Sequence, residues 1–151
     1  MNADPEAASE AASVQVEPLF RPQPGGLPLG VRALDEARAL ELLGGTGVGR
    51  VIYTVGALPA VLPVRFRLDR DGGVLLSAAA GSELARAVDG AVIAFEADEV
   101  DGADGTGWCV TVLGRAELRT VDGPDRPDTG LVEIRIGPEL VVGRRLTVEA
   151  H

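Results

Sequence analysis

The spacing of apolar residues changes along this chain. Residues 1–30 are rich in Ala, Glu, Ser, Pro and Gly, a composition that cannot bury enough apolar surface to offset the entropy lost on ordering. Beyond them the apolar residues first follow a helical repeat and then the two-residue repeat of strands. The pattern predicts a flexible leader over residues 1–30 and one domain over residues 31–151.

Most of the predicted domain is strand. A short helix is expected over Leu34 to Leu43, with Asp35 as N-cap and Gly44 and Gly45 as its stop. The segments with strand character are Val48–Val55, Ala60–Leu68, Val74–Ala78, Ala91–Ala97, Trp108–Leu118, Leu131–Ile136 and Leu140–Leu146. Six or so strands favour a small closed antiparallel barrel, because closure removes exposed strand edges.

The second of these strands alternates clearly between its two faces. Val64, Phe66 and Leu68 fall on one face, and Arg65 and Arg67 fall on the other. The first two strands are expected to form an antiparallel pair, and the turn residues 69–73 predict that the third strand folds back beside the second. Residues 108–118 are apolar at both parities, so one face is expected to fill the barrel and the other to meet a partner subunit or a cofactor.

A second short helix is predicted at Glu83 to Val88. Ser82 is its expected N-cap, and Gly90 ends it. Free amides at a helix start attract anions, which makes Gly81 and Ser82 a candidate phosphate site. Glu83 adds negative charge there and favours an ordinary capped helix. The arginines that could restore a positive potential are Arg65, Arg67 and Arg86.

Composition excludes several kinds of chemistry. All 14 basic residues are arginines, so a Schiff-base lysine and the lysine of a P-loop are absent. The single histidine is the last residue, His151, which excludes a catalytic triad in the core and a His-rich metal site. Any chemistry must therefore come from a bound cofactor.

The net charge and the targeting signals limit which partners and which compartment are expected. A formal charge of −9 opposes nucleic-acid binding, which requires cations to neutralise phosphates. The chain has no stretch of about 18 apolar residues, and its start lacks the pattern of a signal peptide. We therefore expect a cytoplasmic protein without a membrane partner. The lone Cys109 forms no intrachain disulfide and is expected to be buried and inert.

Three other features have both a structural and a functional interpretation. The glycine-rich run 44–49 follows a helix and opens a strand, the reverse of a dinucleotide loop, and is best read as a connector. The acidic segment 98–107 lacks the spacing of a calcium loop and is best read as solvated. Trp108, the only tryptophan, is either a core or interface residue or a surface on which a flat cofactor stacks.

The order of segments over roughly residues 33–146 resembles the pyridoxamine 5′-phosphate oxidase-like family, in its small, largely actinobacterial branch. The stretches that carry the resemblance are LDEARALELLGGTGVGRV, LPAVLPVRF, VLLSAAAGSELARAV, AVIAFEADEVD, TGWCVTVLGRAEL and IRIGPELVVGRRL. The resemblance implies a mainly β fold, a six-stranded antiparallel split β-barrel with two short helices. It also implies a homodimer that holds flavin mononucleotide (FMN) in grooves between the subunits.

The resemblance also assigns candidate cofactor-binding residues by position. A strand segment would line the flavin ring, a second strand end and a helix start would face the phosphate, and a tryptophan would lie near the cofactor or the interface. In this sequence these residues are Pro63, Val64, Arg65, Ser77, Gly81, Ser82, Glu83 and Trp108.

Two functions follow from the resemblance. The first is an FMN-dependent oxidoreductase of a small molecule, with a deazaflavin as a minor alternative cofactor. The second is a non-catalytic binding or accessory protein that has lost FMN. Relatives commonly have a lysine where this chain has Glu83, and this exchange of charge motivates the second function. A purely structural dimer is a third reading.

Overall fold

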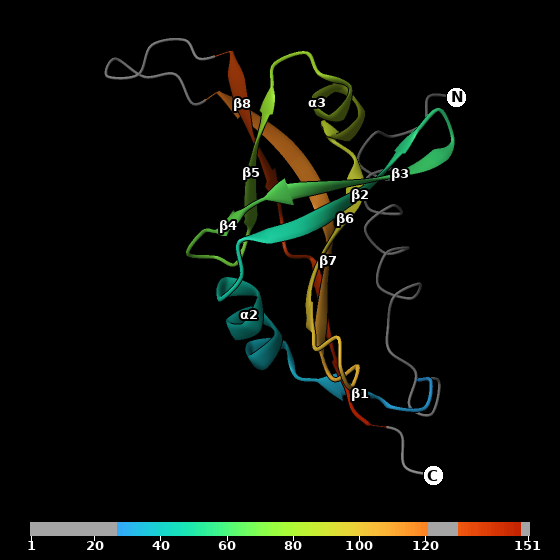
Figure 1. Ribbon diagram of the computed structural model, residues 1–151. Helices are drawn as coiled ribbons and strands as arrows, with labels where there is room; N and C mark the ends of the chain where they lie inside the picture. The colour runs from blue at the N-terminus through green and yellow to red at the C-terminus, as the bar shows by residue number, and fades with distance from the viewer. Residues whose placement is uncertain (1–26, 121–129, 149–151) are drawn as a thin grey trace, which may run out of the picture.

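The computed structural model describes residues 27–120 and 130–148 (Figure 1). Residues 1–26 of the predicted leader lie outside the described residues. Within the described ranges, nine strands and two helices follow one another along the chain. They are β1 (Val31–Leu34), α2 (Glu36–Gly44), β2 (Val48–Val55), β3 (Leu58–Arg65), β4 (Arg67–Leu68), β5 (Val74–Ala79), α3 (Glu83–Val88), β6 (Val92–Val100), β7 (Gly107–Thr120), β8 (Leu131–Ile136) and β9 (Leu140–Leu146).

The mainly β fold and both short helices are confirmed. The structure has nine strands, against the six or so expected and the seven segments named, and two differences account for the increase from seven to nine. Val31 to Leu34 forms β1 and pairs with β9, whereas the sequence predicted no element at residues 31–33 and placed Leu34 at the start of a helix. The single strand expected over residues 60–68 is interrupted at Phe66, which divides it into β3 and β4.

The strands form an open antiparallel sheet in the order β3-β2-β6-β7-β8-β5-β4, and β9 pairs with β7 and β1. The long strand β7 joins the two halves, because its first half pairs with β6 and β9 and its last residues pair with β8. β3 lies at one end of the order and β5 with β4 at the other, although they are neighbours in the sequence (Figure 1).

Two expectations about strand pairing are corrected. The sheet is open rather than closed, so β3 keeps an edge without a strand partner among the described residues. The third predicted strand, β5, pairs with the end of the second only at β4, through Arg67 and Leu68. Its longer partner is β8, with six paired positions from Val74 to Ala79. The expected β2–β3 pair is confirmed.

The core lies between the curled halves of the sheet. Its largest fully buried side chains are Phe95, Leu43, Ile134, Ile136, Val51, Val74, Val88, Val110 and Val112. β7 contributes Trp108, Val110 and Val112 to the core, whereas Cys109 and Thr111 on the opposite face are only half-buried. The expectation that one face of this strand fills the core is confirmed, and contact of the other face with a partner subunit or a cofactor stays a prediction.

Helix α2 covers one end of the core. Asp35 caps it by accepting a hydrogen bond from the Arg38 amide, at 2.8 Å, and Ala39 and Leu43 are its fully buried residues. Ala39 packs against β9 at Gly143, where an added Cβ would lie 2.7 Å from that of Ala39. Neither helix of residues 27–120 and 130–148 has the length and apolar character needed to span a membrane.

A glycine in β2 makes room for the aromatic contact at the β3–β4 break. The rings of Phe66 and Phe95 lie 4.6 Å apart at a tilt of 60°. A Cβ at Gly49 would overlap the Phe95 ring and would lie 2.7 Å from the carbonyl oxygen of Glu96. The glycine-rich run therefore serves packing at Gly49, in agreement with its interpretation as a connector rather than a phosphate loop.

We predict that Gly49→Ala lowers the free energy of unfolding by about 2–3 kcal/mol, because a methyl group cannot fit without moving backbone. Gly47→Ala is the matched control, since nothing lies within 4 Å of a Cβ at that position. Urea denaturation of both variants measures the difference. Equal stability of the two variants would contradict the packing constraint at Gly49.

Candidate functional site

The site lies where the chain passes from one end of the sheet to the other. The Asp69 amide donates to the Gly73 carbonyl at 2.9 Å, and the next rung of the same ladder pairs Arg67 with Leu75. In an antiparallel ladder the following rung would join Arg65 to Ser77. That rung is not made: the ladder with β5 ends at Arg67, and β3, which ends at Arg65, pairs with β2 alone among the described residues.

Hydrogen-bond parity shows which backbone groups of β3 face this opening. Successive residues of a strand turn their N–H and C=O groups to opposite sides. The Phe66 amide donates to the Gly47 carbonyl at 3.0 Å, on the β2 side, so residues of the same parity, such as Val64, also point toward β2. The N–H and C=O of Arg65 and the carbonyl of Pro63 therefore point toward the unpaired edge.

The same reasoning applies to β5 on the other side of the opening. Gly73 accepts a hydrogen bond on the β4 side, whereas the Ala80 amide donates to Gly130, at 2.8 Å, on the β8 side. Ser77 shares the parity of Gly73, so its N–H and C=O point away from β8 and into the opening. The opening thus presents backbone donors and acceptors from both strands.

Two prolines keep the edge of β3 from pairing with another strand. Pro59 and Pro63 lie at the parity that faces away from β2, where a proline interrupts no hydrogen bond of the β2–β3 ladder. A strand that approached this edge would find no amide donor at either position. The edge remains available to a ligand that needs carbonyl acceptors and, beside the pocket, the amide donor of Arg65; Val61 carries the other amide of this parity in β3.

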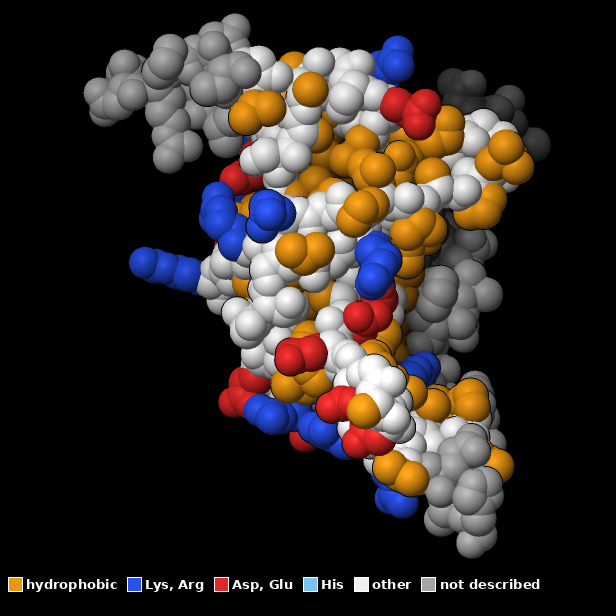
Figure 2. Space-filling model, viewed as in Figure 1, with side chains coloured by type: hydrophobic (Ala, Val, Ile, Leu, Met, Phe, Trp, Pro, Cys, Tyr) orange, Lys and Arg blue, Asp and Glu red, His pale blue; other side chains and the backbone are white. Residues whose placement is uncertain are grey.

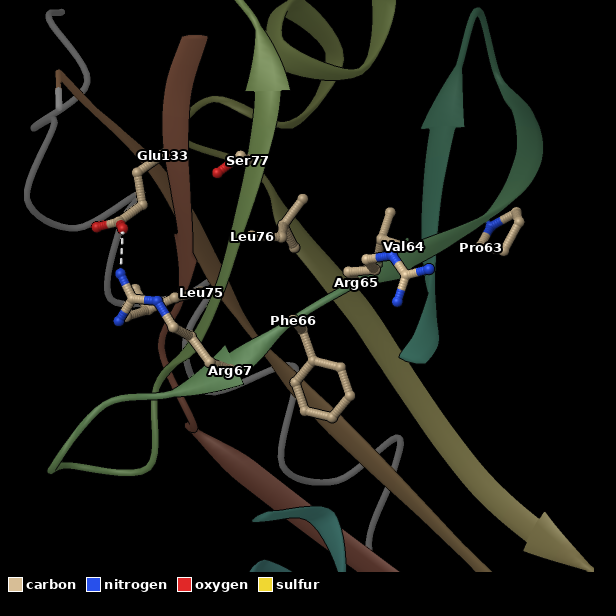
Figure 3. A pocket seen from close by; sticks show the side chains of 9 residues that line it. All are labelled: Pro63, Val64, Arg65, Phe66, Arg67, Leu75, Leu76, Ser77 and Glu133. Carbon is tan, nitrogen blue, oxygen red and sulfur yellow. Dashed lines mark hydrogen bonds and ion pairs between the residues drawn. The ribbon is translucent and has the colours of Figure 1, made fainter. Parts of the chain in front are cut away.

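A pocket of about 450 Å³ occupies the opening. Figure 3 shows its lining side chains, which come from the end of β3, β4, β5 and β8. The lining residues are Pro63, Val64, Arg65, Phe66, Arg67, Leu75, Leu76, Ser77 and Glu133. The volume lies in the usual range of small-molecule sites, and the lining combines apolar side chains with the polar or charged Arg65, Arg67, Ser77 and Glu133.

The charged groups of the pocket are unequally paired. Nη2 of Arg67 lies 2.8 Å from Oε2 of Glu133, and the carboxylate is the more buried partner, with 15% of the Glu133 side chain exposed against 68% for Arg67. Arg65 is exposed and forms no ion pair with any residue in ranges 27–120 and 130–148. The pocket therefore carries two cations and one anion.

The turn below the pocket is fixed by a second ion pair. Nε of Arg135 donates to Oδ2 of Asp69 at 2.6 Å, and the other carboxylate oxygen accepts from the amides of Asp71 and Gly73. Hydrogen bonding from Arg135 is the main cause that lowers the pKa of Asp69 to about 2. These contacts hold the β4–β5 hairpin and so fix the position of Arg67 relative to β5.

Four of the residues predicted to bind a cofactor line this one pocket: Pro63, Val64, Arg65 and Ser77. The other four do not line it. Gly81, Ser82 and Glu83 form the start of α3, where the Ser82 hydroxyl accepts from the Ala85 amide at 3.2 Å and Glu83 is exposed. Trp108 is buried in the core.

Of the remaining lining residues, sequence reasoning named only Arg67 for the site, as an arginine that could restore a positive potential near the predicted phosphate site. Phe66 and Arg67 continue the predicted strand, so their proximity to Arg65 was a usable signal. Glu133 had no such signal, because it lies 56 positions after Ser77 in the chain and reaches the pocket only through the register that pairs the two residues.

A second polar cluster lies on the outer face of β2, β6 and β7. Arg50 lies 2.9 Å from Glu96 and 3.4 Å from Asp98, and the Cys109 thiol donates to Glu96 at 3.4 Å. Burial, followed by the negative charge of Glu96, raises the pKa of Cys109 to about 11, so the thiol stays protonated. Within the described part of the chain, no three His, Cys, Asp or Glu residues are placed to hold a metal ion.

The split sheet and its pocket define the class of protein, and comparison with known proteins gives the family. A family model described as pyridoxamine 5′-phosphate oxidase matches residues 35–139. The chain belongs to this family, as the order of its segments predicted.

Individual relatives agree with this assignment. An uncharacterized protein of Mycobacterium tuberculosis is 34% identical over 135 residues, which cover 78% of this chain and 87% of the relative. The structure of an FAD-binding protein from Mycobacterium smegmatis is similar, with a TM-score of 0.63, 29% identity and coverage of 77% of this chain and 98% of the other. The structure of a putative pyridoxamine 5′-phosphate oxidase from Corynebacterium glutamicum is also similar. Its TM-score is 0.61 and its identity 27%, and the match covers 83% of this chain and 100% of the other.

Proposed function

We propose that this protein binds a flavin in the pocket between β3 and β5 and uses it to oxidise or reduce a small molecule. The observation that carries the proposal is the missing rung between Arg65 and Ser77, which leaves backbone donors and acceptors of both strands facing a pocket with apolar and charged lining residues. A flat ring with polar atoms along one edge fits such a site, because its edge replaces the missing strand. The similarity to a structure described as FAD-binding supports this choice of ligand.

Different residues of the pocket make different kinds of contact with such a ring. The N–H of Arg65 and the N–H of Ser77 are donors toward it, the carbonyl of Pro63 is an acceptor, and Val64 and Leu76 cover its apolar surface. A bound flavin supplies hydride or electron transfer, which no side chain of this protein provides. The protein orients the ring and excludes water from it.

FMN is the form of flavin that we favour, with a deazaflavin as the alternative. Gly81, Ser82 and Glu83 follow β5 directly and are the phosphate end that the family resemblance implies. Glu83 is exposed and acidic, which weakens phosphate binding there and favours a second candidate function, a binding or accessory protein without FMN turnover.

A second copy of the chain is the proposed partner. β3 exposes apolar side chains on both of its faces, with 71% of Leu58 and 59% of Val61 accessible. Figure 2 shows hydrophobic side chains gathered on the upper part of this face of the molecule, where Figure 1 places α3 and the β2–β3 hairpin. Such a surface beside the pocket fits an isologous homodimer that completes the ligand site.

Ser77→Pro tests the backbone donor in the pocket. The substitution removes an N–H that faces away from β8, so we expect a small loss of stability and a loss of flavin affinity of at least about tenfold. Ala78→Pro is the matched control, because the amide of Ala78 faces β8 and its loss breaks the ladder. Titration with FMN, followed by flavin fluorescence, together with thermal unfolding, measures both effects. Unchanged FMN affinity in a folded Ser77→Pro protein would refute the proposed ring position.

Val61→Asp tests the homodimer. A carboxylate at this exposed position of β3 opposes burial of the strand against a second copy, so we expect monomers in sedimentation equilibrium and a flavin affinity reduced about tenfold. Val148→Asp is the control, because Val148 is exposed to a similar degree, 67%, and lies outside β3. A wild-type protein that is monomeric at micromolar concentration would contradict the dimer.

A further inference from the structure

The charges of the pocket contrast with those of the whole molecule. The chain has 23 acidic and 14 basic residues, yet the pocket holds two arginines and one glutamate. Arg65 and Arg67 are two residues apart on an extended chain, so their Cα atoms are separated by roughly 7 Å. Figure 3 shows Arg67 turned toward Glu133 and Arg65 turned the other way. A local excess of positive charge on an acidic protein indicates an anionic ligand.

Glu133 leaves most of the hydrogen-bonding capacity of Arg67 unused. Only one guanidinium nitrogen of Arg67, Nη2, donates to the carboxylate, although a guanidinium has five N–H donors. The Glu133 contact therefore orients Arg67 across the pocket while other donors remain available. It also reduces the positive potential that an entering anion meets.

The start of α3 has fewer free donors and less positive charge to bind an anion than the pocket has. α3 has six residues, its cap Ser82 already accepts the Ala85 amide, and the exposed Glu83 follows immediately. Neither Ser82 nor Glu83 lines the pocket. The cations that an anion requires lie instead on the β3–β4 segment.

We propose that Arg65 and Arg67 bind an oxyanion, a phosphate or a carboxylate, at the mouth of the pocket, and that Glu133 orients Arg67 and limits the affinity for that anion. This inference rests on the proposed function, since it concerns the same pocket. It places the anionic group at the β3–β4 segment rather than at α3. The oxyanion belongs either to the tail of FMN or to a second, anionic ligand.

The test compares FMN with riboflavin, which lacks the phosphate. For Arg65→Gln we expect an FMN affinity about tenfold lower and a riboflavin affinity unchanged within about twofold. For Glu133→Gln, which keeps a hydrogen-bond acceptor, we expect FMN affinity to rise about threefold. Arg70→Gln is the control, because Arg70 is exposed and outside the pocket and the substitution changes net charge equally.

A second measurement uses inorganic phosphate alone. Titration of the protein, followed by the NMR resonances of the arginine Nε–H groups, is expected to show saturable shifts for Arg65 and Arg67 and none for Arg70. If these shifts occur while the ratio of FMN to riboflavin affinity is the same in wild type and Arg65→Gln, the oxyanion belongs to a second ligand, and the arginine site stands.

Two outcomes separate this inference from the proposed function. If neither flavin binds the wild-type protein, the flavin proposal fails, and the phosphate titration alone decides whether the arginine site exists. If flavin binds but Arg65→Gln and Arg67→Gln change neither the affinity ratio nor the phosphate titration, the arginine site is refuted and the flavin proposal is unaffected.

Discussion

The structure depends on one interruption in a hydrogen-bond ladder. The hairpin between β4 and β5 makes two rungs and then stops at Phe66, whose ring packs beside Phe95 and before which β3 pairs with β2 alone among the described residues. A closed barrel would satisfy every backbone group of these strands internally. The interruption leaves some of them facing a pocket, and it places Arg65, Arg67 and Ser77 around the same space.

Much of the fold follows from local patterns in the sequence. The bounds of β2, β8, β9 and α3 agree with the predicted segments, because each has strong alternation or a clear cap and is bordered by glycine, proline or a capping serine. β1 was missed because its four residues follow a segment rich in proline and glycine, and its partner β9 lies at the other end of the domain. Strand order depends on such long-range pairing, which periodicity does not encode.

The residues of the candidate site that are close in sequence were predictable, and those brought in by long-range strand pairing were not. Pro63, Val64 and Arg65 are consecutive in the sequence. Ser77 lies on the next predicted strand, and the predicted turn at residues 69–73 brings that strand back toward them. Glu133 could not be found this way, because its place in the pocket depends on the register of β8. For Trp108 the sequence left a core or interface role and a cofactor-stacking role open, and the structure places the side chain in the core.

The missing rung also gives the account its most direct test, which is the hydrogen exchange of single backbone amides with and without FMN. The amides of Arg65 and Ser77 face the pocket, whereas those of Val64 and Leu76 are already bonded within their ladders. We predict that FMN slows exchange at Arg65 and Ser77 and changes exchange at Val64 and Leu76 much less. Unaltered exchange at Arg65 and Ser77 in a flavin-saturated protein would contradict it.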